Sequence, residues 1–141
     1  MIQVCPSCGA QNRIPVSRVA ASKAHCGRCK AELRAPSDPL AVSTEAEFDE
    51  WVRDARVPVL VDFWAPWCGP CRAVAPELAN VARSRTGHAV VLKVNTDELP
   101  TLAGRYHIRS IPTMVLFRDG RESKRASGAM SAPAIASTFA L

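Results

Sequence analysis

Apolar and polar residues alternate after residue 44 in a way that predicts helices and strands in turn. Thr44 and Glu47 have the spacing of a capping box, a pair that begins many helices. The apolar residues that follow recur at the helical period: Phe48, Trp51, Val52 and Ala55. Residues 59–64 are rich in β-formers and almost wholly apolar, which is typical of a strand covered on both faces.

A second helix is predicted after residue 68, and residues 90–94 form another apolar run typical of a buried strand. Asp119-Gly120 is a hairpin signal. The other predicted elements are a short helix over 99–106, strands over 114–117 and 122–127, and a last helix that Ser131 caps. This order predicts an α/β fold, a mixed sheet with helices on both faces.

The chain divides near residues 35–40, where two prolines occur without apolar periodicity. We expect this segment to link a small module, residues 1–34, to a larger domain, residues 41–141. A piece of about 35 residues cannot bury an adequate core alone, so the small module needs another source of stability.

The formal net charge is +5, and most of it lies in residues 1–38, whose net charge is +4. Two interpretations of this basic piece are open: charge that keeps a small domain soluble, or a patch for nucleic acid. The piece lacks the interleaved aromatic residues that single-strand binding favours, so no nucleic-acid partner is expected. No targeting segment or long apolar run is visible, and we therefore expect a cytoplasmic protein without a membrane partner.

All six cysteines occur in Cys-x-x-Cys pairs: Cys5/Cys8, Cys26/Cys29 and Cys68/Cys71. The first two pairs have the spacing C-x2-C-x17-C-x2-C, a zinc pattern. Four thiolates would complete a tetrahedron around one Zn²⁺ without an open position, so we expect a structural metal that stabilises the small module. Gly9 and Gly27 would let backbone amides turn toward the sulfurs. Two disulfides or four free thiols are the alternative, and His25 is a less favoured substitute ligand.

The third pair follows a predicted buried strand and opens a predicted helix. Unpaired N–H groups and the positive end of the helix dipole favour a thiolate at Cys68, and a thiolate is the form that attacks a disulfide. Cys71 lies about one turn further in. Gly69 permits close backbone approach, and Pro70 suits a first helical turn. A third metal knuckle or a pair of inert thiols remains the alternative.

The segment Val61-Asp62-Phe63-Trp64-Ala65-Pro66-Trp67-Cys68-Gly69-Pro70-Cys71 resembles the active-site signature of the thioredoxin family. Pro76, the segment Ser110-Ile111-Pro112-Thr113, Gly120 and Gly128 match the family in the same order, so the resemblance covers about residues 40–141. It implies a thioredoxin fold and a monomeric protein-disulfide reductase with a redox-active Cys68–Cys71 disulfide. The implied partners are oxidised substrate proteins and an NADPH-dependent thioredoxin reductase.

The resemblance also implies roles for residues around the cysteine pair. Asp62, inside an apolar strand, would act as a base for Cys71, and Lys93 would tune it by charge or instead face solvent. Pro112 would follow a cis peptide bond, and Trp67 would form an apolar docking rim with the backbones of Ile111 and Gly128. His107 departs from the family because a smaller residue is common at its position.

The N-terminal module resembles the zinc-containing thioredoxins of the thioredoxin 2 type. That module would bind partners or release zinc on oxidation. A zinc-ribbon binding module on a redox-inert scaffold is a second functional hypothesis, and an oxidase or isomerase on the same fold is a third. The intact Cys-Gly-Pro-Cys sequence favours the reductase.

Overall fold

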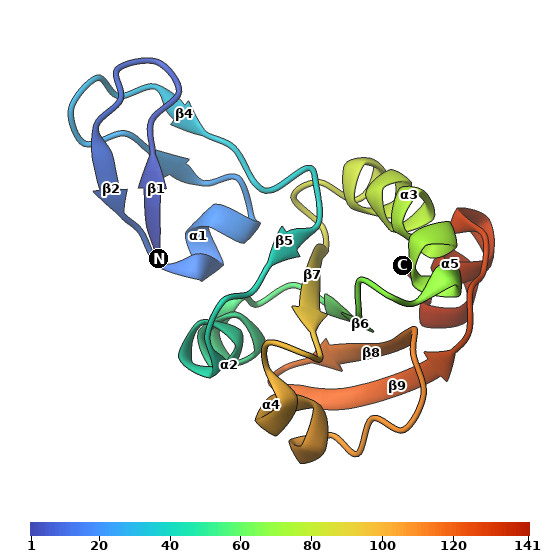
Figure 1. Ribbon diagram of the computed structural model, residues 1–141. Coiled ribbons are helices and arrows are strands. Elements are labelled where there is room, and N and C mark those ends of the chain that lie inside the picture. Colours follow the sequence, from blue (N-terminus) through green and yellow to red (C-terminus); the bar gives the residue numbers. More distant parts are fainter.

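The computed structural model describes all 141 residues, and its larger part is built on a five-stranded sheet (Figure 1). The strand order is β5-β7-β6-β8-β9. The strands are β5 (Leu40–Ala41), β6 (Val59–Trp64), β7 (Val90–Asn95), β8 (Thr113–Arg118) and β9 (Arg121–Ser127). Strands β5, β7 and β6 run parallel, whereas β8 is antiparallel to β6 and β9 is antiparallel to β8. The predicted mixed sheet is confirmed.

Helices cover both faces of this sheet, as predicted. They are α2 (Glu45–Asp54), α3 (Gly69–Ser84), α4 (Pro100–Arg105) and α5 (Ala132–Phe139). One apolar layer joins α3 and α5 to the sheet through Leu60, Leu78, Val91, Met114 and Ile135. The other layer contains α2 and α4 residues packed with alternate strand positions, among them Phe48, Val61, Phe63, Leu92 and Leu102. Neighbouring residues on β6 therefore face different helices, which decides the surroundings of Asp62.

Local sequence signals account for several element boundaries. Thr44 caps α2, because its Oγ1 accepts a hydrogen bond of 3.1 Å from the Glu47 N–H. The Glu47 carboxylate accepts from the N–H of Ser43, one residue before the position that a capping box uses. Asp119 and Gly120 both have positive φ, 54° and 78°, which the tight turn between β8 and β9 requires.

Strand β5 was not expected, because its first residue is the last one of the predicted linker. It has only two residues, which pair with Leu92 and Lys93 of β7. A two-residue strand is too short to carry an apolar period, so its partner strand rather than its own sequence defines it.

The N-terminal module consists of two small hairpins and a short helix. Its elements are β1 (Ile2–Val4), β2 (Gln11–Arg13), α1 (Val16–Ala20), β3 (Ala24–His25) and β4 (Glu32–Leu33). Buried residues of the module, such as Val19 and Leu33, belong to the same apolar cluster as Phe48 and Trp51 of α2. The module therefore packs against the larger part and shares its core.

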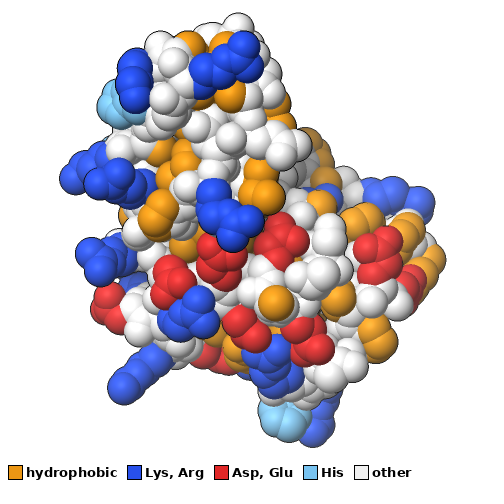
Figure 2. Space-filling model, turned by 90° about the vertical axis from the view of Figure 1, so that its left-hand side faces the viewer, with side chains coloured by type: hydrophobic (Ala, Val, Ile, Leu, Met, Phe, Trp, Pro, Cys, Tyr) orange, Lys and Arg blue, Asp and Glu red, His pale blue; other side chains and the backbone are white.

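Charge also joins the two parts. Acidic side chains gather across the middle of the face that carries α2, below the narrower, more basic N-terminal module (Figure 2). The N-terminal ammonium of Met1 lies 3.0 Å from a carboxylate oxygen of Glu50 on α2. None of the helices combines the length and the apolar character that crossing a membrane requires.

Candidate functional site

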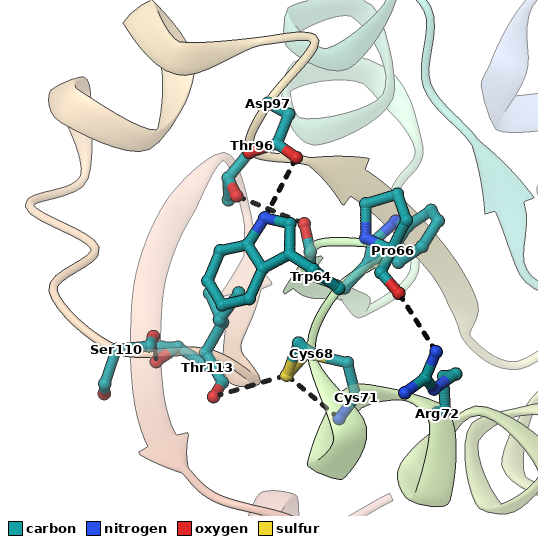
Figure 3. Close-up of a disulfide and its surroundings, with 11 residues drawn as sticks. Trp64, Pro66, Cys68, Cys71, Arg72, Thr96, Asp97, Ser110 and Thr113 are labelled. Carbon is teal, nitrogen blue, oxygen red and sulfur yellow. Dashed lines mark hydrogen bonds between the residues drawn. A yellow bond between two sulfur atoms is a disulfide. The ribbon is translucent and has the colours of Figure 1, made fainter.

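Cys68 and Cys71 form a disulfide where β6 leads into α3 (Figure 3). Their Cα atoms are 5.2 Å apart, and both side chains are largely buried. Cys68 has extended backbone angles and is the N-cap of α3, with Gly69 and Pro70 in the first turn. The disulfide therefore lies beyond the carboxyl end of β6, the central strand of the sheet, at the N-terminus of α3.

The backbone directs positive character at the Cys68 sulfur. The N–H of Cys71 points at Cys68 Sγ over 3.1 Å. The 16 residues of α3 add the dipole of a long helix. Both effects stabilise a thiolate on Cys68 once the disulfide is reduced. On the other side of this sulfur, the carbonyl oxygen of Ile111 lies 3.7 Å away.

The loop before β8 forms one wall beside the disulfide. The peptide bond between Ile111 and Pro112 is cis, as the resemblance implied. The Pro112 carbonyl accepts a hydrogen bond of 2.9 Å from the N–H of Gly128. Thr113, which is buried, donates its hydroxyl to the carbonyl of Ser110 over 2.6 Å. These bonds fix the loop between α4 and β8 next to the end of β9.

Trp67 directly precedes Cys68 and is the most exposed large apolar residue, with 68% of its surface accessible. Its indole N–H donates to a carboxylate oxygen of Asp97 over 3.1 Å, which holds the ring in place without burying it. Arg72 donates to the carbonyl of Pro66, the residue before Trp67, over 3.4 Å. An exposed, fixed aromatic ring beside a disulfide is a suitable contact for another protein.

Asp62 lies on β6 with 1% of its surface accessible, and neither of its carboxylate oxygens has a hydrogen-bond partner. Alternate strand residues share a face, so Asp62 lies on the same side of the sheet as Leu60, which packs under α3. Burial raises the pKa of Asp62 to about 7, and the positive charge of Lys93 limits the rise. The carboxyl group can therefore take or release a proton near neutral pH.

Lys93 is directly opposite Asp62 in the parallel ladder between β6 and β7. Its ammonium lies 4.3 Å from the centre of the Trp64 ring, and the side chain is half-buried. A cation over an aromatic face is held by the ring's negative face. Lys93 thus contributes charge to the site while bound to the ring.

His107 follows α4 with a φ of 53°, the left-handed region that favours glycine. Its N–H bonds to the Gly104 carbonyl, and the next N–H, of Ile108, bonds to Ala103, so the turn closes the helix. A smaller residue suits this position because only glycine adopts such a φ without strain.

The four N-terminal cysteines form a second cluster, where the two cysteine-bearing loops meet at the outer end of the module (Figure 1). All four sulfurs lie within 4.8 Å of one another. The Sγ atoms of Cys5 and Cys29 are 3.6 Å apart, as are those of Cys8 and Cys26. Zinc–sulfur bonds of about 2.3 Å place tetrahedral sulfurs about 3.8 Å apart, so the cluster fits one Zn²⁺.

Both cysteine loops have the same backbone bonds. The N–H of Gly9 bonds to the Cys5 carbonyl and that of Lys30 to the Cys26 carbonyl, each over 2.9 Å. Gly9 and Lys30 have positive φ, 75° and 65°. Next to Gly27, the N–H of Arg28 points at Cys26 Sγ over 3.4 Å, while the N–H of Gly27 itself bonds to a side-chain oxygen of Asn12. Backbone N–H groups of Cys29 and Arg28 lower the pKa of Cys26 to about 6.

Two residues at these sites were missed by sequence reasoning. Asp97 holds the Trp67 ring, and Asn12 contacts the Cys26 loop. Each acts across the fold, so no local spacing could have indicated it. His25 is exposed in β3 and is not part of the cluster.

A mixed five-stranded sheet with a Cys-x-x-Cys disulfide at a helix N-terminus, beside a cis-proline loop, defines a thiol–disulfide oxidoreductase of the thioredoxin fold. Comparison with known proteins gives the family. The thioredoxin family matches residues 39–140, and the family described as "Thioredoxin 2, N-terminal" matches residues 4–31.

Relatives and solved structures agree with these matches. The chain is 41% identical over 130 residues to thioredoxin C-3 of Corynebacterium nephridii, covering 92% of this chain and 87% of that one. It is 48% identical over 99 residues to thioredoxin 1 of Synechococcus elongatus, covering 70% and 92%. A mutant thioredoxin from Halobacterium salinarum has a similar structure, with a TM-score of 0.66 and 35% identity over 75% of this chain and 95% of that one. The chain belongs to the thioredoxin family and carries the N-terminal zinc-ribbon domain of thioredoxin 2.

Proposed function

We propose that this chain reduces disulfide bonds in oxidised proteins and that an NADPH-dependent thioredoxin reductase recharges it. The single observation that carries the proposal is the Cys68–Cys71 disulfide at the start of α3, with the N–H of Cys71 aimed at Cys68 Sγ. In the reduced chain, the Cys68 thiolate attacks one sulfur of a substrate disulfide and forms a mixed disulfide. The other substrate sulfur leaves as a thiolate.

Cys71 then attacks Cys68 Sγ and completes the transfer of two electrons. The bond between Cys68 and the substrate breaks, the second substrate thiolate leaves, and the Cys68–Cys71 disulfide forms. Attack requires the Cys71 thiol to lose its proton, and Asp62 is the proposed acceptor. Its burial and its pKa of about 7 support this role, because a base that titrates near the working pH transfers protons well in both directions. Lys93 is proposed to tune that carboxyl through its charge.

Substrate docking is proposed to use Trp67 and the loop around Pro112, beside the disulfide. The exposed Trp67 ring would cover apolar surface of the substrate, while the backbones of Ile111 and Gly128 would pair with an extended segment around the attacked sulfur. Gly69 and Pro70 keep the surface above the disulfide small, and Pro112 sets the direction of the loop. The bond from Gly128 to Pro112 supports a docking surface that is preformed.

The N-terminal cysteines Cys5, Cys8, Cys26 and Cys29 are proposed to bind one structural Zn²⁺, which would supply the bonds that hold the two loops together. We propose the division into a zinc ribbon, residues 1–34, a linker, residues 35–40, and a thioredoxin domain, residues 41–141. A cluster of reduced cysteines suits a reducing compartment, so the proposed location is the cytoplasm. The proposed working form is a monomer.

A coupled insulin-reduction assay with NADPH and thioredoxin reductase tests the proposal. The native chain should consume NADPH at a rate that depends on its concentration, and Cys68→Ser should give the rate of the reductase alone. The same assay with dithiothreitol in place of the reductase separates the two parts of the proposal. Turnover with dithiothreitol but not with NADPH and the reductase would refute recharging by that reductase. No turnover with either reductant would refute the reductase activity itself.

A further inference from the structure

Asn12 connects the two halves of the cysteine cluster. It lies on β2 of the first hairpin, and its side chain reaches the loop of the second cysteine pair. Its Nδ2 lies 3.6 Å from Cys26 Sγ and 3.2 Å from the carbonyl of Ala10. Its Oδ1 accepts the N–H of Gly27 over 2.9 Å. One amide side chain therefore donates to a sulfur and accepts from the backbone next to that sulfur.

The two cysteine loops repeat with an offset of 21 residues, from Cys5 to Cys26 and from Gly9 to Lys30. Each loop closes with the same pair of backbone bonds. The residue equivalent to Asn12 in the second loop is Leu33, which is fully buried in the apolar core. The polar amide is thus a departure from the repeat, and its side chain reaches a sulfur of the cluster.

The departure also makes the sulfurs unequal. Cys26 Sγ receives the Asn12 amide and the N–H of Arg28, at 3.6 and 3.4 Å. No side-chain nitrogen donates to Cys5. Cys26 is fully buried, so water cannot replace a donor that is removed from its sulfur. Hydrogen bonds to a metal-bound sulfur both orient the ligand and disperse its negative charge.

We propose that Asn12 is a positioning residue of the zinc site, which fixes the Cys26 loop on the first hairpin and donates a hydrogen bond to the Cys26 thiolate. This inference rests on the zinc site proposed above. Loss of such a partner typically weakens metal binding about 10–100-fold. The Asn12 amide accordingly slows the release of zinc.

The experiment compares zinc release from the native chain and two variants. Asn12→Ala removes the amide. Asn12→Asp keeps the shape and the acceptor for Gly27 but replaces the donor with a negative charge facing four thiolates. Gln11, the exposed neighbour on β2, provides the matched controls Gln11→Ala and Gln11→Asp. Zinc content is measured first, then the rate of zinc transfer to a chromogenic chelator, and then the sulfur-to-metal charge-transfer band of the Co²⁺-loaded proteins.

The proposal predicts one zinc per native chain, release about tenfold faster from Asn12→Ala, and still faster release from Asn12→Asp. Both Asn12 variants should shift the Co²⁺ charge-transfer band, and both Gln11 variants should stay within about twofold of the native rate with an unshifted band. Far-UV circular dichroism and dithiothreitol-driven insulin reduction verify that the larger domain of each variant is folded.

Other results overturn the inference in distinguishable ways. A native chain that binds no zinc would overturn the zinc site and the role of Asn12 together. Zinc-loaded native protein with unchanged release from both Asn12 variants would overturn the role of Asn12 alone. Slow release from Asn12→Asp with fast release from Asn12→Ala would show that shape and the Gly27 bond suffice, which overturns the donor role.

Discussion

Asp62 and Lys93 lie opposite each other on neighbouring parallel strands, yet they do not form an ion pair. The Lys93 ammonium lies over the Trp64 ring, and both carboxylate oxygens of Asp62 lack a hydrogen-bond partner. The lysine therefore lowers the pKa of the aspartate only in part, and burial keeps it near 7. A paired carboxylate would be ionised at all physiological pH values and would be a poor proton acceptor for Cys71.

The first prediction concerns the cost of this buried carboxyl. In the unfolded chain the pKa of Asp62 is about 3.9. Between about pH 4 and pH 7 the Asp62 carboxyl is therefore ionised in the unfolded chain but still protonated in the folded chain. Stability contributed by the native protonated form is complete below about pH 4 and falls as pH rises through 7. Asp62→Asn should therefore raise the free energy of unfolding by about 2–4 kcal/mol at pH 8 and give little gain at pH 4.

Urea unfolding at the two pH values measures this effect, and stopped-flow measurement of substrate release tests the proposed role in the same variant. Release of the mixed disulfide should be slower in Asp62→Asn. An equal stability gain at both pH values would contradict the titration of Asp62, and unchanged release would contradict its role as a base.

The second prediction concerns His107. A non-glycine residue in the left-handed region costs roughly 1–2 kcal/mol, and glycine recovers part of this despite its greater freedom in the unfolded chain. His107→Gly should thus raise the free energy of unfolding by about 0.5–1 kcal/mol, measured in urea. His107→Ala keeps the Cβ and should give no gain. Equal effects of glycine and alanine would show that the φ angle is not the cause.

A third prediction follows from the shared core of the two domains. Val19 and Leu33 of the ribbon belong to the same apolar cluster as Trp51 of α2. Removal of zinc by a chelator should therefore lower the stability of the whole chain by more than about 2 kcal/mol and shift its tryptophan fluorescence to the red. Thermal unfolding with and without the chelator measures the loss. An unchanged melting temperature would mean that the ribbon folds without metal.

The active site should tolerate the same treatment for a geometric reason. Ser22 of the ribbon lies close to Gly87, beyond the C-terminal end of α3. Cys68 is at the other end of this 16-residue helix, about 24 Å away along its axis. Protein from which a chelator has removed zinc should keep most of its dithiothreitol-driven insulin reduction at temperatures below its melting temperature.

The fourth prediction concerns Trp67. Truncating an exposed aromatic anchor usually weakens binding to a partner protein far more than it changes chemistry. Trp67→Ala should raise KM for insulin roughly tenfold and leave kcat within about twofold. Asp97→Ala should have a smaller effect in the same direction, since the ring stays but loses its hydrogen bond. Reduction of a small disulfide, measured in parallel, should not change; an equal loss there would place Trp67 in the chemistry instead.

Sequence reasoning found what is local in this chain. The helical and strand periods gave the elements from α2 to α5, and cysteine spacing gave both sites, because backbone turns bring residues three positions apart together. It did not find β5, whose two residues carry no period, or the contacts of Trp67 with Asp97 and of Asn12 with Cys26. Those contacts span 30 and 14 residues and depend on how separate elements pack.

The most direct test of the proposed reductase is to trap its intermediate. Cys71→Ser retains the attacking sulfur and removes the resolving one, so incubation of the reduced variant with an oxidised protein substrate should give a covalent adduct. Intact-mass spectrometry should find the sum of the masses of the variant and the substrate, and dithiothreitol should cleave the adduct. Cys68→Ser, the matched control, should give none. An adduct with Cys68→Ser and none with Cys71→Ser would contradict the assignment of the nucleophile, and no adduct with either would contradict the reductase mechanism.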